Sequence, residues 1–358
     1  MLCGGGFVAV EIKEGNKMER IKKTLYSLCE EMTISGFEYL AEKKIRELCG
    51  DIFDSIEITP MGTYIMVKKC ARENAPKMLI DAHLDNVGMM VTDIKDGGFL
   101  AVTNIGGLDA RVLPATEVTV YGKEQIYGLI TSTPPHLRKL GADSVPKIDE
   151  LYVDTGYKKE ELEKIVTVGD VVGYRFAYTE MANGFVTTSG LDDKACLTAV
   201  IEAMRDIKRE DMAYDVYVTA SSQEETGKNG SARASFTVEP DIAITTDVNF
   251  AKGDGTPDYE CIACGEGASV DVSSLTDKTL TRNILKMLEN REIKHQVICE
   301  PGRTYTNNEG LLISGKGVRT AVLSVPLKNM HTPCETVNLK DVLSLKEIIV
   351  AIACEENL

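Results

Sequence analysis

The sequence predicts an α/β fold, a helix–sheet–helix sandwich interrupted by a small β-rich insertion. Residues 78–83 and 320–326 are short, almost continuously apolar runs, typical of central strands in a helix-covered sheet. Amphipathic stretches such as residues 194–208 alternate with these runs, as expected of an α/β sandwich. Residues 92–183 instead contain short β-type runs separated by glycines, which indicates an inserted domain. The alternative is that residues 92–183 add strands to the main sheet.

Composition limits the possible partners. The chain has 358 residues, 43% of them apolar, which is enough for two domains and a sizeable core. It contains no run of eighteen apolar residues, so we expect no membrane span. The formal net charge of −15 argues against nucleic acid or an anionic membrane as a partner. We therefore expect a soluble protein.

The ten cysteines are scattered rather than closely spaced. In a chain of this size they indicate reduced thiols and a cytoplasmic location. Cys261 and Cys264 form a single CxxC pair, which without a second pair carries little weight as a zinc site.

The first elements follow from local signals. Residues 1–17 are Gly-rich at their start and lack a signal-peptide pattern, so we expect an extension outside the fold. Residues 18–32 have a helical apolar stripe, and a second helix over residues 37–48 follows an apparent capping box of Ser35 and Glu38. Strands are expected at residues 64–68 and 78–83.

Within the insertion, residues 117–121 and 125–130 predict strands, and residues 158–164 a short helix. The α/β pattern then returns with a helix over residues 194–208, and strands at residues 215–220 and 241–246. A helix over residues 277–290, a strand at 320–326 and a helix over 339–352 complete the fold. The main domain is thus discontinuous, comprising residues 18–91 and 184–358.

His83 and Asp85 lie two residues apart at the end of an apolar strand, so alternation places both side chains on one side. His83 can bind a metal while Asp85 accepts the other ring N–H and fixes the tautomer. A structural His–Asp pair is the alternative. Asp192 and Asp193 precede the helix over residues 194–208, where one acid commonly caps the helix. We assign Asp192 as a carboxylate able to bridge two metals.

Two adjacent acids follow the strand at residues 215–220, and they repel each other unless a cation compensates them. Glu225 would bind metal and Glu224 would move a proton, with a solvated acidic turn as the alternative. Asp247 also follows a strand, at the edge where open α/β sheets build their sites. His331 follows the strand ending at Pro326 and by itself would be read as an ordinary loop residue.

His136 and His295 lie away from comparable acid pairs, and we assign neither to metal. The joint occurrence of two histidines and three carboxylates predicts a pair of metal sites sharing one water. Such an arrangement is typical of a two-metal hydrolase.

Six segments resemble the tetrahedral-type dinuclear metallo-aminopeptidases, which include glutamyl and deblocking aminopeptidases and members named endoglucanase M. The matching segments are Asp81-Ala-His-Leu-Asp-Asn-Val-Gly, Gly106-Gly-Leu-Asp-Ala-Arg-Val-Leu-Pro, Pro134-Pro-His-Leu, Gly190-Leu-Asp-Asp-Lys, Gln223-Glu-Glu-Thr-Gly and His331-Thr-Pro-Cys-Glu. They occur in family order from about residue 18 to the end of the chain. Coverage of this length makes the resemblance specific.

The resemblance implies a zinc-peptidase-like fold with a small β-barrel or PDZ-like insertion that mediates dimerisation. Two divalent metal ions, zinc or cobalt and alternatively manganese, would be held by five ligands, with Asp192 bridging and Glu224 as general base and acid. The ligands are His83, Asp192, Glu225, Asp247 and His331. The substrate would be a peptide that loses its N-terminal residue. The dimers would assemble into a tetrahedral dodecamer.

Three positions depart from the family pattern. Asn86 follows Asp85 where relatives usually have Glu, Tyr305 stands where an acid is common, and Lys328 replaces a usual Arg. These departures leave open the substrate preference and a non-catalytic assembly protein on the same scaffold. A glycoside hydrolase is a further alternative, prompted by the endoglucanase name of some relatives.

Overall fold

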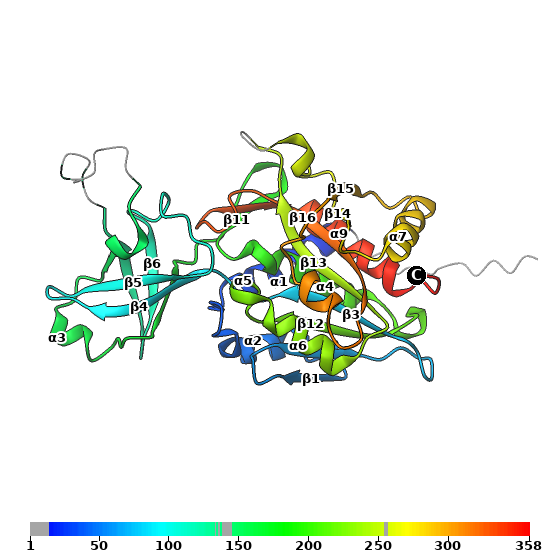
Figure 1. Cartoon of the computed structure of the whole chain (residues 1–358), viewed down its shortest axis with the longest axis horizontal. Coiled ribbons are helices and arrows are strands. Elements are labelled where there is room, and N and C mark those ends of the chain that lie inside the picture. The colour runs from blue at the N-terminus through cyan, green and yellow to red at the C-terminus, as the bar shows by residue number, and fades with distance from the viewer. Residues whose placement is uncertain (1–13, 133, 135–136, 138–144, 254–256) are drawn as a thin grey trace, which may run out of the picture.

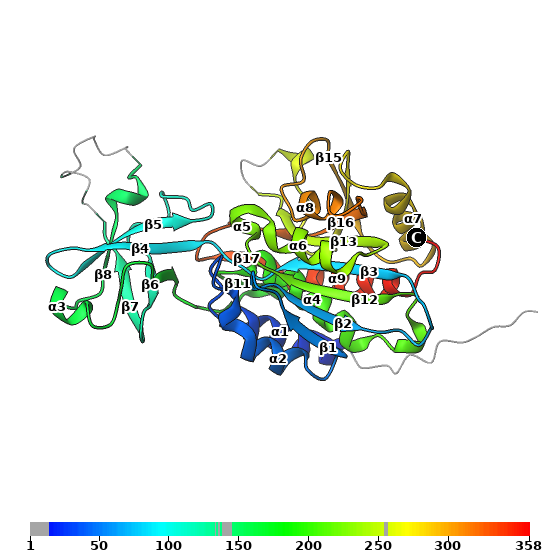
Figure 2. The ribbon, with the colours of Figure 1, turned by 60° about the horizontal axis from the view of Figure 1, so that its bottom comes forward.

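The computed structural model describes residues 14–132, 134, 137, 145–253 and 257–358. Its main sheet has eight strands in the order β1-β2-β12-β3-β13-β16-β14-β15. Their bounds are β1 (Ser55–Ile58), β2 (Tyr64–Lys68), β3 (Lys77–His83), β12 (Asp215–Ser221), β13 (Ile242–Phe250), β14 (Ser269–Ser273), β15 (Gln296–Glu300) and β16 (Arg319–Leu327). Figure 2 shows these strands in that order from β16 to β1.

The four central strands β12, β3, β13 and β16 are mutually parallel, so their carboxyl ends meet at one edge of the sheet. Because side chains alternate along β3, Met78 and Ile80 join the larger core while Leu79 joins the core on the opposite face. Helices cover both faces, which confirms the predicted sandwich.

The larger core packs α1 (Glu14–Cys29), α4 (Leu191–Asp206), α7 (Lys278–Asn290) and α9 (Leu339–Ala353) against one face of the sheet. On the other face lie α6 (Asn229–Val238) and α8 (Asn308–Leu312), whose Ala234, Val238 and Leu311 pack on Leu79 and Ala243. A three-stranded sheet of β10 (Thr179–Glu180), β11 (Phe185–Thr188) and β17 (Glu335–Asn338) lies next to α4 and α9.

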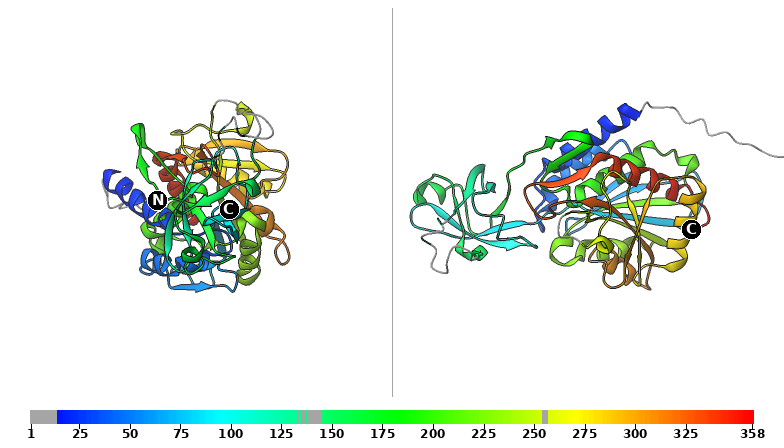
Figure 3. Two further views of the ribbon diagram at one scale, coloured as in Figure 1. Left: turned by 90° about the vertical axis from the view of Figure 1, so that its left-hand side faces the viewer. Right: turned by 90° about the horizontal axis from the view of Figure 1, so that it is seen from above.

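Six strands form a closed barrel in the order β4-β5-β8-β7-β6-β9. They are β4 (Gly88–Ile94), β5 (Phe99–Ile105), β6 (Glu117–Tyr121), β7 (Gln125–Ile130), β8 (Tyr152–Asp154) and β9 (Val171–Tyr174), with the short α3 (Lys159–Leu162) before β9. The barrel has its own apolar core, including Met89, Leu100 and Val120. It projects from one end of the main body, as Figures 1 and 3 show. The predicted β-rich segment therefore contains a barrel rather than an extension of the main sheet. The barrel strands lie within residues 88–174, and β10, near the end of the predicted insertion, pairs with β11 instead.

Two local predictions at the N-terminal end were wrong. Helix α1 begins at Glu14 and ends at Cys29, so residues 14–17 are helical, while residues 1–13 of the expected extension lie outside the described part. The capping box did not form, because a 3-10 helix (Glu38–Ala41) precedes α2 (Glu42–Cys49) and neither helix has a side-chain cap. Ser35 instead contacts the Thr226 hydroxyl at 2.9 Å.

Among the described helices, none combines the length and apolar character needed to cross a membrane.

Candidate active site

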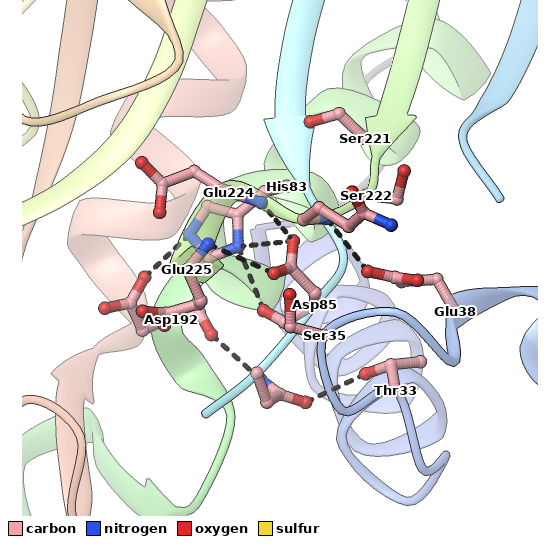
Figure 4. Close-up of polar contacts among 12 residues, drawn as sticks. Thr33, Ser35, Glu38, His83, Asp85, Asp192, Ser221, Ser222, Glu224 and Glu225 are labelled. Atoms are coloured by element: carbon pink, nitrogen blue, oxygen red, sulfur yellow. Dashed lines mark hydrogen bonds and ion pairs between the residues drawn. The ribbon is translucent and has the colours of Figure 1, made fainter. Parts of the chain in front are cut away.

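The predicted site residues come together at the carboxyl edge of the parallel strands. His83 ends β3, Asp247 lies near the end of β13, and Asp192 lies at the start of α4. The chain continues from β12 into α5 (Glu224–Gly227), which begins with the two glutamates. His331 comes from the loop between β16 and β17, and Figure 4 shows His83, Asp192 and Glu225 facing one another. Open α/β sheets bind ligands at this edge.

Asp192 lies between the two imidazoles. Its Oδ1 is 3.0 Å from Nε2 of His83, and its Oδ2 is 3.4 Å from Nε2 of His331. His331 Nε2 also lies 3.2 Å from Oε1 of Glu225, and His83 Nε2 lies 3.8 Å from Oδ1 of Asp247. Five possible ligand groups far apart in sequence therefore lie together, with the Asp192 carboxylate between the two imidazoles.

The donor set fits divalent cations. Two groups of ligand atoms, His83 with Asp192 and Glu225, and His83 with Asp193 and Asp247, each lie within 4.8 Å of one another. Both carboxylate oxygens of Asp193 and Oε1 of Glu224 are buried without a hydrogen-bond partner among the described residues. Buried carboxylates are costly unless a cation or a donor compensates them. Nitrogen and oxygen ligands of this kind suit zinc, cobalt or manganese.

Burial dominates the electrostatics of the acids. It raises the pKa of Glu224 to about 7 and the pKa of Asp193 and Asp247 well above their ordinary value. For His331 burial lowers the pKa, but Asp192 and Glu225 outweigh it and raise that pKa to about 11. Burial likewise opposes ionisation of Asp192, yet the two imidazoles hold its pKa below the ordinary value. In the absence of cations, protons on the imidazoles and acids thus offset the negative charge of the buried carboxylates.

Asp85 does not play the predicted part toward His83. The Nδ1 atom of His83 lies 2.9 Å from the backbone carbonyl oxygen of Asp85, whereas the Asp85 carboxylate is 3.6 Å away. The carbonyl can only accept, so Nδ1 is the donor and Nε2 faces Asp192. The Asp85 carboxylate instead accepts the backbone N–H groups of Glu224 at 3.0 Å and Glu225 at 3.1 Å. It therefore positions α5.

A second acid that the sequence did not reveal as part of the site holds the same turn. Glu38 Oε1 accepts the backbone N–H of Gly36 at 2.9 Å. It also accepts the backbone N–H of Gln223 at 2.9 Å, and Figure 4 shows Glu38 beside this turn. The Glu38 side chain is buried, and burial raises its pKa to about 7. The sequence predicted Glu38 as part of a local helix cap, whereas one of its two N–H partners, Gln223, is 185 residues away.

Glu335 was also missed as a positioning group, although it ends the His331-Thr-Pro-Cys-Glu segment. Its carboxylate accepts the backbone N–H of His331 at 2.7 Å and of Leu191 at 2.8 Å. It thereby joins the His331 loop to the start of α4. Burial raises the pKa of Glu335 to about 8.

The three unusual positions have different surroundings. Asn86 donates from Nδ2 to the backbone oxygen of Asp192 at 3.0 Å and accepts from the Thr33 hydroxyl at 2.8 Å, so it supports the backbone of Asp192. Tyr305 is exposed, with its ring 5.4 Å from the Arg303 guanidinium. The Lys328 ammonium lies over the Phe185 ring at 5.3 Å.

Of the two remaining histidines, only His295 lies in the described part of the chain, and it belongs to neither group of possible metal ligands. The His295 ring contacts the backbone oxygen of Ile293 at 2.9 Å, and His136 lies outside the described residues. Within the described part of the chain, Cys261 and Cys264 belong to neither group of possible metal ligands.

A cavity of about 660 Å³ lies over the cluster and is lined by His83, Asp192, Glu224, Glu225, Asp247 and His331. It extends past β13 to the end of β15 and to the loop at residues 301–306. A cavity that combines buried acids and imidazoles with an open side is typical of a metal-dependent hydrolase.

The chain belongs to the M42 glutamyl aminopeptidase family, whose sequence profile matches residues 62–348. It is 33% identical to the lysyl aminopeptidase of Pyrococcus furiosus, over 86% of this chain and 90% of that protein. It is 23% identical to the glutamyl aminopeptidase of Lactococcus lactis, over 92% and 95% of the two chains. The chain is accordingly a hydrolase of the aminopeptidase class.

Solved structures of aminopeptidases share this fold. An aminopeptidase from Desulfurococcus kamchatkensis superposes with a TM-score of 0.87 at 25% identity, covering 94% of this chain and 95% of that one. The TET1 peptidase of Pyrococcus horikoshii, described as assembling into a tetrahedron or a large octahedral shell, gives 0.82 at 28% identity over 93% and 99%. A Thermotoga maritima protein named endoglucanase gives 0.74 at 25% identity over 92% and 96%. The predicted resemblance to tetrahedral aminopeptidases is confirmed.

Proposed function

We propose that this enzyme removes N-terminal residues from peptides at a dinuclear metal centre. The observation that carries the proposal is that the two oxygens of Asp192 face the two imidazoles of His83 and His331. A carboxylate in that position can bridge two cations, each with its own histidine.

The five ligands would be His83, Asp192, Glu225, Asp247 and His331, holding zinc or cobalt, and alternatively manganese. When bound, such a pair of ions polarises a carbonyl and lowers the pKa of a shared water. Asp193, whose carboxylate is buried beside this set, is an additional candidate ligand.

Glu224 would be the general base and acid. Its side chain lines the cavity, its Oε1 is buried without a hydrogen bond among the described residues, and its pKa is raised to about 7 by burial. A carboxylate with a pKa near neutrality can take a proton from water and return it to the leaving amine. Asp85 and Glu38 would keep Glu224 in place through the backbone amides of residues 223–225.

The test of this assignment is Glu224→Gln. We expect it to lower kcat/KM for aminoacyl-p-nitroanilides by about 100- to 10,000-fold, the usual contribution of a general base. The metal content should stay at that of the wild-type protein, because Glu224 is not among the proposed ligands. Exposed Glu266, which pairs with Lys294 on the surface, gives the matched control Glu266→Gln, which should retain activity. Full activity of Glu224→Gln would contradict the assignment.

We also propose that the chain forms dimers through its barrel and that the dimers assemble into a tetrahedral dodecamer in the cytoplasm. The P. horikoshii relative supports the assembly. Cysteines that form no disulfide, such as Cys29, Cys49 and Cys196, suit the cytoplasm. Analytical ultracentrifugation should give the mass of a dodecamer, and a stable monomer would contradict the proposal.

A glycoside hydrolase is favoured only by the endoglucanase name that some structural relatives carry. Glycosidases need two carboxylates flanking a sugar, whereas here the carboxylates contact imidazoles. Cellulose hydrolysis that survives a chelator would support that alternative. A non-catalytic assembly protein would instead retain no zinc, cobalt or manganese after reconstitution.

A further inference from the structure

The cavity contains an acid that the proposed chemistry does not use. Glu300 is the last residue of β15, the edge strand of the main sheet, and it lines the same cavity as the proposed metal ligands. Its Oε1 accepts a hydrogen bond from Asn249 Nδ2 at 2.8 Å. Its Oε2 is buried and has no hydrogen-bond partner among the described residues. One half of this carboxylate is therefore held in place while the other half lacks a partner.

Asn249 relates Glu300 to the metal cluster. Asp247 and Asn249 are alternate residues of β13, so their side chains leave the strand on the same face, roughly 7 Å apart along it. Glu300 lies one hydrogen bond beyond Asn249. An aminopeptidase that holds the α-amino group and the first carbonyl at the cluster would place the first side chain in this part of the cavity. Asp247 and Glu300 are thus separated by two residues of β13 and one hydrogen bond, a separation that suits the long side chain of a basic residue.

The charges of the cavity favour a cation next to Glu300. Arg303 donates to both carboxylate oxygens of Glu309, and the Lys228 ammonium lies 3.8 Å from both Glu309 and Glu224. Both basic residues that line the cavity thus face acids of their own. No ion pair joins Glu300 to any basic residue among the described positions.

A second acid lies behind Glu300. Asp271 is fully buried, and its Oδ1 and Oδ2 accept hydrogen bonds from the hydroxyls of Ser269 and Ser324. The two acids oppose each other's ionisation: burial first, and then Glu300, raise the pKa of Asp271 to about 7, and burial raises the pKa of Glu300. A cation entering the cavity would relieve this repulsion. The side chains of Val248, Ile298 and Met330 line the cavity as well and would contact an aliphatic stem.

We infer that Glu300 makes this enzyme select peptides whose N-terminal residue is lysine or arginine, the ammonium or guanidinium group pairing with the Glu300 carboxylate at the wall of the cavity. The inference rests on the proposed function and adds the substrate class to it. Asn249 is a positioning residue, because it fixes one oxygen of the carboxylate.

The test compares N-terminal lysine, arginine, norleucine and glutamate in one series of aminoacyl coumarin substrates. Norleucine keeps an unbranched aliphatic stem without the charge. We expect kcat/KM for lysine to exceed that for norleucine by about 10- to 100-fold, as for a site built around a specific polar group. In Glu300→Gln that preference should shrink to about threefold or less, because kcat/KM for lysine falls more than kcat/KM for norleucine. The surface variant Glu266→Gln should keep the wild-type preference.

Binding provides a readout independent of turnover. Free L-lysine should bind the metal-loaded protein at least about tenfold more tightly than L-norleucine by calorimetry, and Glu300→Gln should remove the difference. If no aminoacyl substrate is hydrolysed with any metal, the proposed function fails, and this binding difference alone decides the inference. If Glu300→Gln does not fold, the wild-type comparison of lysine with norleucine decides it. Equal treatment of lysine and norleucine, a preference for glutamate, or a uniform loss with all substrates in Glu300→Gln would overturn the inference.

Discussion

Replacing Asp85 by Asn tests whether this acid acts through the backbone of α5. The carboxylate accepts two backbone N–H groups, from Glu224 at 3.0 Å and from Glu225 at 3.1 Å, and it is fully buried. Asn offers one oxygen, and its NH₂ group would face the second backbone N–H, donor against donor. Hydrogen bonds to charged groups contribute about 1.5–3 kcal/mol, and an unpaired buried donor costs about 1–3 kcal/mol. We therefore expect Asp85→Asn to lower the free energy of unfolding by about 2–4 kcal/mol.

The same change should reduce activity. The freed N–H groups belong to the proposed base and to a proposed metal ligand, and a displacement of about 1 Å at such groups costs roughly 100-fold in rate. We therefore expect kcat/KM of Asp85→Asn to fall about 100-fold, together with the lower free energy of unfolding measured in urea. Asp93→Asn is the control, since Asp93 pairs with Lys95 at the exposed end of β4 and should tolerate the change. An Asp85→Asn protein with wild-type stability and activity within threefold of wild type would refute this role.

Two further changes test packing and metal binding. Gly230→Ala would place a Cβ 2.4 Å from both the Ser222 backbone oxygen and the Thr63 hydroxyl, so we expect about 1–3 kcal/mol of destabilisation in urea. Gly302→Ala is the control, because a Cβ there meets nothing within 4 Å, and it should leave the midpoint of urea unfolding unchanged. Equal destabilisation by both changes would contradict the packing argument. Asp192→Asn should weaken metal binding by tenfold or more, seen as less than one ion per chain after dialysis. Two tightly held ions in that variant would show that Asp192 does not bridge.

The elements that position the site were predictable because their signals are local. The apolar runs before His83 and after residue 319 form parallel neighbours of β13, and the acids following strands lie at one edge because parallel strands end together. The β-rich character of the insertion was also visible in its glycines and short runs. The closed order of the barrel strands, with β8 between β5 and β7, could not be predicted, because it depends on strand pairings between residues distant in sequence.

The supporting acids could not be predicted for the same reason. Glu38 binds the amide of Gln223, and Glu335 binds that of Leu191, partners that only the folded chain brings within reach. The two-residue spacing of His83 and Asp85 was read correctly as a close pair. Spacing alone does not distinguish the Asp85 carbonyl from its carboxylate as the partner of the ring N–H, and the carbonyl is the one within 2.9 Å.

The buried acids of the site also make stability depend on pH in the metal-free protein. Burial raises the pKa of Glu224 to about 7 and that of Glu335 to about 8, and its acid contacts raise the pKa of His331 to about 11. In the unfolded chain these groups titrate near 4.3 and 6.5, so between pH 6 and 8 the folded state binds more protons. The free energy of unfolding must then fall as pH rises, by about 1.4 kcal/mol per pH unit for each extra proton bound. Bound cations would replace those protons and flatten the slope. Urea unfolding at pH 6, 7 and 8, with chelator and with zinc, measures both slopes, and a metal-free protein that becomes more stable toward pH 8 would contradict the argument.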